Sequence, residues 1–153
     1  MSKITLTPNA SGTGTFTIQS PDGNTDRTLT LPDAAGVVSL IDTYNAVTSS
    51  SNATTVDCED GSTFSHTLTE NTTFTFSNAP ASDTPYIMSI EIIQDASASG
   101  YTVTWPSSVD FPAATAPTLT ATADAIDVFV FTTRDGGTTW YGFTAGQAIA
   151  TPA

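Results

Sequence analysis

The chain has 153 residues, with 15 Asp or Glu against 3 Lys or Arg, so its formal net charge is -12 at pH 7. So acidic a chain argues against nucleic acid and anionic membranes as partners, because both are bound largely through Lys and Arg. Only 12% of the residues are charged, whereas Thr and Ser together supply 47.

Residues 1–42 alternate apolar and polar side chains with the period of two that is typical of strands. A segment of about 40 residues cannot usually bury enough surface to fold alone. We therefore expect a β-rich N-terminal arm whose apolar side chains pack against the rest of the chain or against a second copy. These predicted interface residues are Phe16, Ile18, Leu29, Leu31, Val37, Val38 and Leu40.

Residues 43–53 contain three consecutive serines and little apolar pattern, so they are predicted to be a linker. Residues 54–153 then form the second unit, large enough for its own core. Strands are expected over 62–68, 72–77, 86–94, 101–105, 125–132 and 138–143.

The strands at 86–94 and 125–132 are apolar on both faces, which favours central positions in a sheet. No window shows a convincing helical period. The predicted fold is all-β, an antiparallel β-sandwich or jelly-roll-like domain that follows the short arm. The abundant Thr fits this fold, since a β-branched side chain suits a strand and its hydroxyl tolerates water.

The titratable residues do not form a recognisable catalytic motif. His66, the single histidine, shares a strand face with Phe64 and Leu68, so a structural role is expected. Cys58 lies between carboxylates, which would raise the pKa of its thiol rather than activate it. No catalytic residue is assigned, and the chain is expected not to be an enzyme.

Metal and cofactor sites are not expected either. Asp22, Asn24 and Asp26 imitate the start of a calcium loop, but Arg27 stands where the sharp turn needs Gly. A hairpin turn is the simpler interpretation. The acidic cluster Asp57, Glu59 and Asp60 is interpreted as a solvated loop.

The two tryptophans are candidate contacts for a glycan, because aromatic rings can stack on sugars. Trp105 ends one predicted strand and Trp140 lies in another, where it points to the face opposite Tyr141. The aromatic side chains therefore cannot all share one surface, and core or interface positions remain the alternative.

Two sets of short segments carry a resemblance to a known group of proteins. Residues 12–18 (GTGTFTI) with 27–36 (RTLTLPDAAG) resemble segments of tailed-bacteriophage virion appendage proteins. Residues 101–106 (YTVTWP) with 127–129 and 135–142 (DGGTTWYG) are similar to C-terminal modules of phage appendages. The matches are spread over most of the chain, but each is short and rich in common strand residues.

The resemblance implies a non-enzymatic structural protein with one of two roles. The first is a capsid decoration (cement) or head-fibre protein on the outer capsid surface of the virion, bound to the major capsid protein and forming a homotrimer. The second is a tail-fibre or host-glycan-binding module. The short arm and single compact unit favour the capsid, because a tail fibre usually needs a long shaft.

Overall fold

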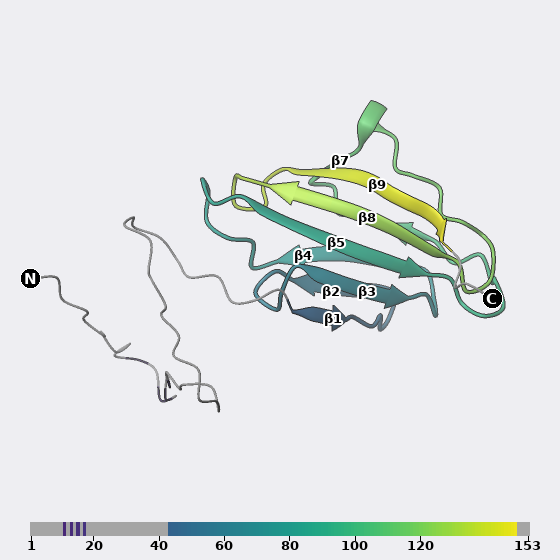
Figure 1. Ribbon diagram of the computed structural model, residues 1–153, viewed down its shortest axis with the longest axis horizontal. Coiled ribbons are helices and arrows are strands. Elements are labelled where there is room, and N and C mark those ends of the chain that lie inside the picture. The colour runs from purple at the N-terminus through teal and green to yellow at the C-terminus, as the bar shows by residue number, and fades with distance from the viewer. Residues whose placement is uncertain (1–10, 12, 14, 16, 18–42, 150–153) are drawn as a thin grey trace, which may run out of the picture. The chain divides into compact units, whose positions relative to one another are not determined.

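The computed structural model describes residues 11, 13, 15, 17 and 43–149 (Figure 1). The predicted interface residues of the N-terminal arm, Phe16, Ile18, Leu29, Leu31, Val37, Val38 and Leu40, lie outside the described residues. The description below therefore concerns residues 43–149, which belong to one compact unit.

This unit is built from strands, as expected for an all-β chain. The described strands are β1 (Tyr44–Ala46), β2 (Ala53–Asp57), β3 (Thr63–Thr67), β4 (Thr72–Ser77), β5 (Tyr86–Ile93), β6 (Val103–Thr104), β7 (Val109–Asp110), β8 (Ile126–Thr133) and β9 (Trp140–Ile149). A single turn of 3-10 helix, η1 (Pro112–Ala114), interrupts the connection between β7 and β8.

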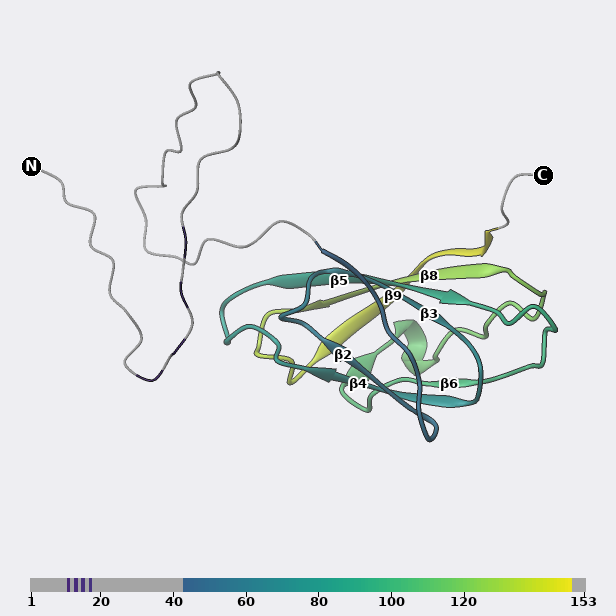
Figure 2. The ribbon, with the colours of Figure 1, turned by 90° about the horizontal axis from the view of Figure 1, so that it is seen from below.

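The strands form two sheets. One has six strands in the order β1-β3-β5-β8-β9-β7, and the other has three in the order β2-β4-β6. Figure 1 shows β5, β8 and β9 side by side in the larger sheet, and Figure 2 shows β2, β4 and β6 apart from β5 and β8. The central positions of β5 and β8 confirm the prediction made from their two apolar faces.

The first six strands alternate between the sheets: β1, β3 and β5 enter the larger sheet, and β2, β4 and β6 enter the smaller one. Because each connection crosses to the other sheet, neighbouring strands run in the same direction. β1 pairs with β3 and β3 with β5 in parallel, and so do β2 with β4 and β4 with β6. From β1 to β6 the chain therefore passes from one sheet to the other at each connection. β8 and β9 then extend the larger sheet beyond β5.

The prediction of an antiparallel domain is wrong for most of the strand pairs. Only β5–β8 and β8–β9 are antiparallel among the pairs that the described strands form, and β7 adds parallel to β9. The physical reason is that a period of two reports which face of a strand is buried. It does not report the direction of the neighbouring strand.

The predicted linker at 43–53 is wrong in part. Tyr44–Ala46 forms β1 and pairs with Thr63–Ser65 of β3, and Val47 packs against the core. The amide of Asn45 donates a hydrogen bond of 2.6 Å to the carbonyl of Asp60. Backbone pairing thus fixes a segment whose polar composition indicated a loop.

Both sheets contribute to one hydrophobic core, which is rich in aromatic rings. Trp105 stacks on Phe74 of the smaller sheet, with ring centroids 5.1 Å apart, and lies 4.9 Å from Phe131 of the larger sheet. Phe76 and Trp140 meet edge to face at 5.1 Å. Such ring pairs stabilise a core beyond the area that they bury.

Candidate functional site

The face of the six-stranded sheet that points away from the core carries apolar side chains. On β5, Met88, Ile90 and Ile92 are buried, whereas Ile87 on the opposite face is 61% exposed. On β9, Tyr141 and Phe143 are 43% and 48% exposed. We call this surface the outer face.

The register places apolar and polar side chains side by side on the outer face, where Glu91 of β5 also lies opposite Val128 of β8. Thr132 of β8 lies between Ile87 of β5 and Tyr141 of β9. In the next row, Val130 lies between Ser89 and Phe143. Exposed large apolar side chains that gather on one face are found at interaction sites, so the outer face is a candidate interface.

The sequence analysis missed the outer face, although its signal was present. β5 and β8 are apolar on both sides, and this pattern predicted central positions in a sheet. In the structure one side of each strand is core and the other belongs to the outer face.

Trp140 does not offer a ring to a sugar, since it is 1% exposed and packs against Phe76 and Tyr86. Trp105 is 9% exposed, and one face of its ring is covered by Phe74. Burial in the core thus contradicts a stacking platform made of both tryptophans. The remaining edge of Trp105 borders a cavity of about 420 Å³ beside Asp110 and Phe111.

His66 has the structural position that the sequence predicted. It is 1% exposed, and its Nδ1 lies 3.0 Å from the carbonyl oxygen of Val47. Because a carbonyl only accepts, Nδ1 carries the proton and donates it. Nε2 is buried without a hydrogen-bond partner, and the ring packs edge to face against Phe74.

Cys58 is buried, as an inert thiol would be. The pKa of its thiol is raised to about 11. Burial is the largest cause; the hydrogen-bonded side chain of Tyr86 lowers the pKa, and the charge of Asp57 raises it further. Sequence reasoning gave the correct direction but attributed it to the neighbouring carboxylates alone. Desolvation is the larger cause.

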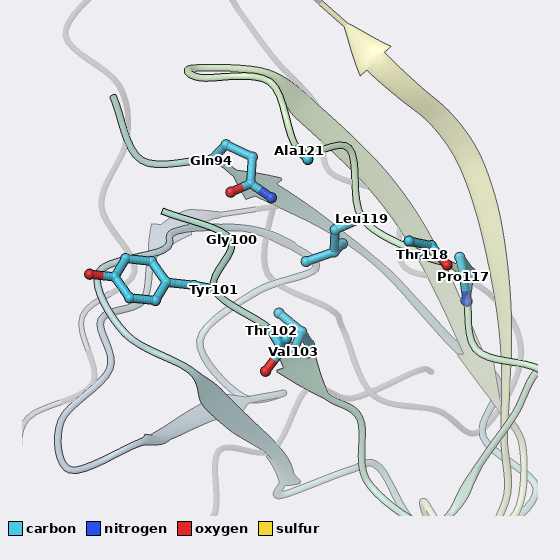
Figure 3. Close-up of a pocket in the computed structure, with 9 residues that line it drawn as sticks. All are labelled: Gln94, Gly100, Tyr101, Thr102, Val103, Pro117, Thr118, Leu119 and Ala121. Carbon is cyan, nitrogen blue, oxygen red and sulfur yellow. The ribbon is translucent and has the colours of Figure 1, made fainter. Parts of the chain in front are cut away.

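A second candidate site is a cavity of about 260 Å³ beside the edge strand β6 (Figure 3). Gln94 and Leu119 lie on one side of it and Tyr101 and Val103 on the other. Gln94 is 4% exposed, and its side-chain oxygen Oε1 is buried without a hydrogen-bond partner. We call this the Gln94 cavity; the full lining is Gln94, Gly100, Tyr101, Thr102, Val103, Pro117, Thr118, Leu119 and Ala121.

Hydrogen bonds fix the segment 100–103 on one side of the Gln94 cavity. Asp95 accepts hydrogen bonds from the backbone N–H groups of Ser97 and Ser99, at 3.0 and 2.8 Å, which closes the loop before Gly100. The Asn71 side chain accepts from the backbone N–H of Thr102 at 2.9 Å. The hydrogen bond from the Ser99 hydroxyl, followed by those from the backbone of Ser99 and Ser97, holds the pKa of Asp95 below its usual range.

Asp127 fixes the opposite side of the cavity. Its carboxylate is 2% exposed and accepts hydrogen bonds from Thr120, Ala148 and Gln147. Gln147 also donates to the carbonyl of Thr118, at 2.6 Å. Burial alone would raise the pKa of Asp127, but its hydrogen bonds outweigh burial and hold the pKa below the usual value.

Within the part of the chain that the structure describes, no group of three or more His, Cys, Asp or Glu side chains is arranged to hold a metal ion. The acidic cluster Asp57, Glu59 and Asp60 instead forms a turn, in which Asp57 accepts hydrogen bonds from the Glu59 backbone and the Asn78 side chain. No helix among the described residues is long and apolar enough to cross a membrane.

The outer face and the Gln94 cavity are therefore two features of residues 43–149 that are suited to binding. Comparison with models of protein families, with curated proteins and with solved structures finds no match for this chain.

Proposed function

We propose that the chain is a non-enzymatic structural protein of a tailed bacteriophage, a capsid decoration (cement) or head-fibre protein on the outer capsid surface. The observation that carries the proposal is the outer face, where Ile87 of β5 and Tyr141 and Phe143 of β9 are exposed on either side of β8. An exposed apolar sheet face fits a protein that works in an assembly. The sequence resemblance supplies the identity of that assembly.

The proposed architecture is a two-sheet β-sandwich preceded by the N-terminal arm. The arm, residues 1–42, binds the major capsid protein, and the outer face joins copies of the chain into a homotrimer. A trimer repeats one interface around an axis and fits the three-fold positions of a capsid. Several modest contacts then act together, so that the assembled trimer binds far more tightly than one copy.

Deletion of residues 1–42 tests the attachment. The truncated chain should remain folded and lose its binding to capsids that lack the native protein, measured by co-sedimentation. The matched control is the full-length chain carrying Thr73→Val, a change on an exposed strand position of the smaller sheet. Unchanged capsid binding by the folded truncated chain would contradict the proposal.

A tail-fibre or host-glycan-binding module is the second candidate. The observation that favours it is the Gln94 cavity, whose nine lining residues are all uncharged. In this role the chain would be found on the tail rather than the head, and it would bind host glycans in the absence of capsids.

A further inference from the structure

We propose that the outer face binds a neighbouring copy of the chain through an ion pair, in which Glu91 of one copy meets Arg134 of the next. The inference rests on the proposed function, because it takes the outer face to be the contact between copies. It goes further by naming the two charged side chains that fix how the copies meet.

Glu91 is a single charge among neutral side chains near the middle of the outer face. It lies on β5, between Ser65 of β3 and Val128 of β8. The other outer-face positions of β1, β3, β5 and β8 carry uncharged side chains. A further carboxylate, Asp110, lies at the far edge of the face on β7, beside Tyr141. Within the described residues the Glu91 carboxylate makes no hydrogen bond or ion pair, so none of them neutralises its charge.

A copy that covers the outer face also covers Glu91. The exposed side chains of Phe143 and Ile87 lie in the two rows that follow the row of Glu91 across the sheet. Removing a carboxylate from water without a cation is strongly unfavourable. An apolar partner surface alone would therefore bind poorly. The surface that fits the outer face brings one cation to Glu91.

Arg134 is the one Lys or Arg among residues 43–149, against eleven Asp and Glu. It is exposed, and within the described residues its guanidinium makes no hydrogen bond or ion pair. The adjacent Asp135 carboxylate instead accepts hydrogen bonds from Thr133 and Thr139. A planar guanidinium is well suited to pair with a carboxylate at an interface. Arg134 is therefore the described side chain that can supply the cation.

Glu91 and Arg134 are too far apart to pair within one copy. Glu91 lies opposite Val128 of β8, and Arg134 follows six residues later, just beyond the end of that strand. At about 3.3 Å per residue, the two positions are roughly 20 Å apart along the sheet. The pair can thus form only between copies. Because it joins two different sites of the surface, the interface is heterologous, which is the kind that closes into a ring such as a trimer.

The test is a charge exchange in the full-length chain, with the dissociation constant of the oligomer measured by analytical ultracentrifugation. Glu91→Arg and Arg134→Glu should each raise this constant at least about tenfold. The double variant has the native net charge and should return to within about threefold of the native value. Glu59→Arg, in an exposed loop, and Arg27→Glu, in the arm, are the matched controls. They make the same changes of charge and should assemble as the native chain does.

The neutral variant Glu91→Gln separates a paired from an unpaired carboxylate by the sign of its effect. It should weaken assembly if Arg134 of the next copy faces position 91. It would tighten assembly if Glu91 were covered without a cation, because the cost of removing its charge from water would disappear. Unfolding by urea checks that each variant is folded.

The outcomes distinguish the ion pair from the proposed function. Tighter assembly of Glu91→Gln, native assembly of either charge reversal, failure of the double variant to recover, or an equal loss in the controls would overturn the ion pair. In those cases the outer face would still stand as the contact if Phe143→Lys weakens assembly. A native chain that stays monomeric would overturn both the ion pair and the proposed trimer.

Discussion

Thr120 donates two hydrogen bonds to the carboxylate of Asp127, one from its backbone N–H and one from its hydroxyl, both 2.7 Å long. Ala148 of β9 donates a third from its backbone at 2.9 Å. One buried carboxylate thus joins the loop that precedes β8 to the end of β9. This arrangement fixes one side of the Gln94 cavity. Replacement of Asp127 should therefore lower the stability of the fold.

Asp127→Asn should destabilise the fold by about 2 kcal/mol, because hydrogen bonds to a charged group are among the stronger ones. Each carboxylate oxygen faces two donors, so the amide nitrogen of Asn would oppose donors wherever it is placed. Urea unfolding, followed by the fluorescence of the buried tryptophans, measures the change. Asp95→Asn, in an exposed loop, is the control with the same change of charge and should cost less. Equal losses would contradict the role of Asp127.

The contribution of Asp127 should also depend on pH. Its folded-state pKa is held below the usual 3.8, because its hydrogen bonds outweigh the effect of burial. A depressed pKa means that the carboxylate stabilises the fold above pH 3.8, and that this contribution is lost as the pH falls through the folded-state pKa. The stability difference between the native chain and Asp127→Asn should therefore be full at pH 7 and shrink below pH 3.8. A difference that stays constant throughout would contradict this linkage.

Gly61→Ala should test whether residues 43–46 are part of the domain. Gly61 has a φ of +147°, and a Cβ at this position would lie 2.2 Å from the carbonyl oxygen of Thr43. We expect the free energy of unfolding to fall by about 3 kcal/mol. The backbone must move to relieve the clash with Thr43, and an alanine at this positive φ is strained in addition. Gly100→Ala is the control, because Gly100 also has a positive φ but has open space around its Cβ position. It should cost about 1 kcal/mol, and equal costs would show that Thr43 does not pack against Gly61.

Phe143→Lys should weaken self-association if the outer face joins copies of the chain. A charged side chain at the centre of an apolar interface must be buried without a partner. The dissociation constant of the oligomer should rise at least about tenfold, measured by analytical ultracentrifugation. Thr73→Lys adds the same charge on the smaller sheet and should leave the oligomer unchanged. If both variants assemble like the native chain, the outer face is not the contact between copies.

Much of the strand content could be predicted from the sequence, because burial of one face imposes a period of two. β4 (Thr72–Ser77), β5 and β8 begin and end within one residue of the ranges expected from the pattern. β1, β2 and β7 were missed. All three are edge strands, which pairing with β3, β4 and β9 holds in place. Local composition contains no signal for such long-range pairing.

The candidate sites could be predicted less well. The burial of Trp105 and Trp140 depends on how the two sheets pack, which the pattern of a single strand does not reveal. The Gln94 cavity brings Gln94 next to Leu119, 25 positions away in the sequence. The orphaned oxygen of Gln94 could be recognised only once its surroundings were known, whereas the structural position of His66 followed from its apolar neighbours.

Electron cryo-microscopy of intact particles of the phage to which we propose that the chain belongs tests the central claim most directly. Comparison of native particles with particles that lack the protein should give a density difference on the outer surface of the head, repeated with three-fold symmetry and large enough for residues 43–149. A difference confined to the tail would contradict the capsid role and favour the tail-fibre alternative. Identical particles would contradict a virion role altogether.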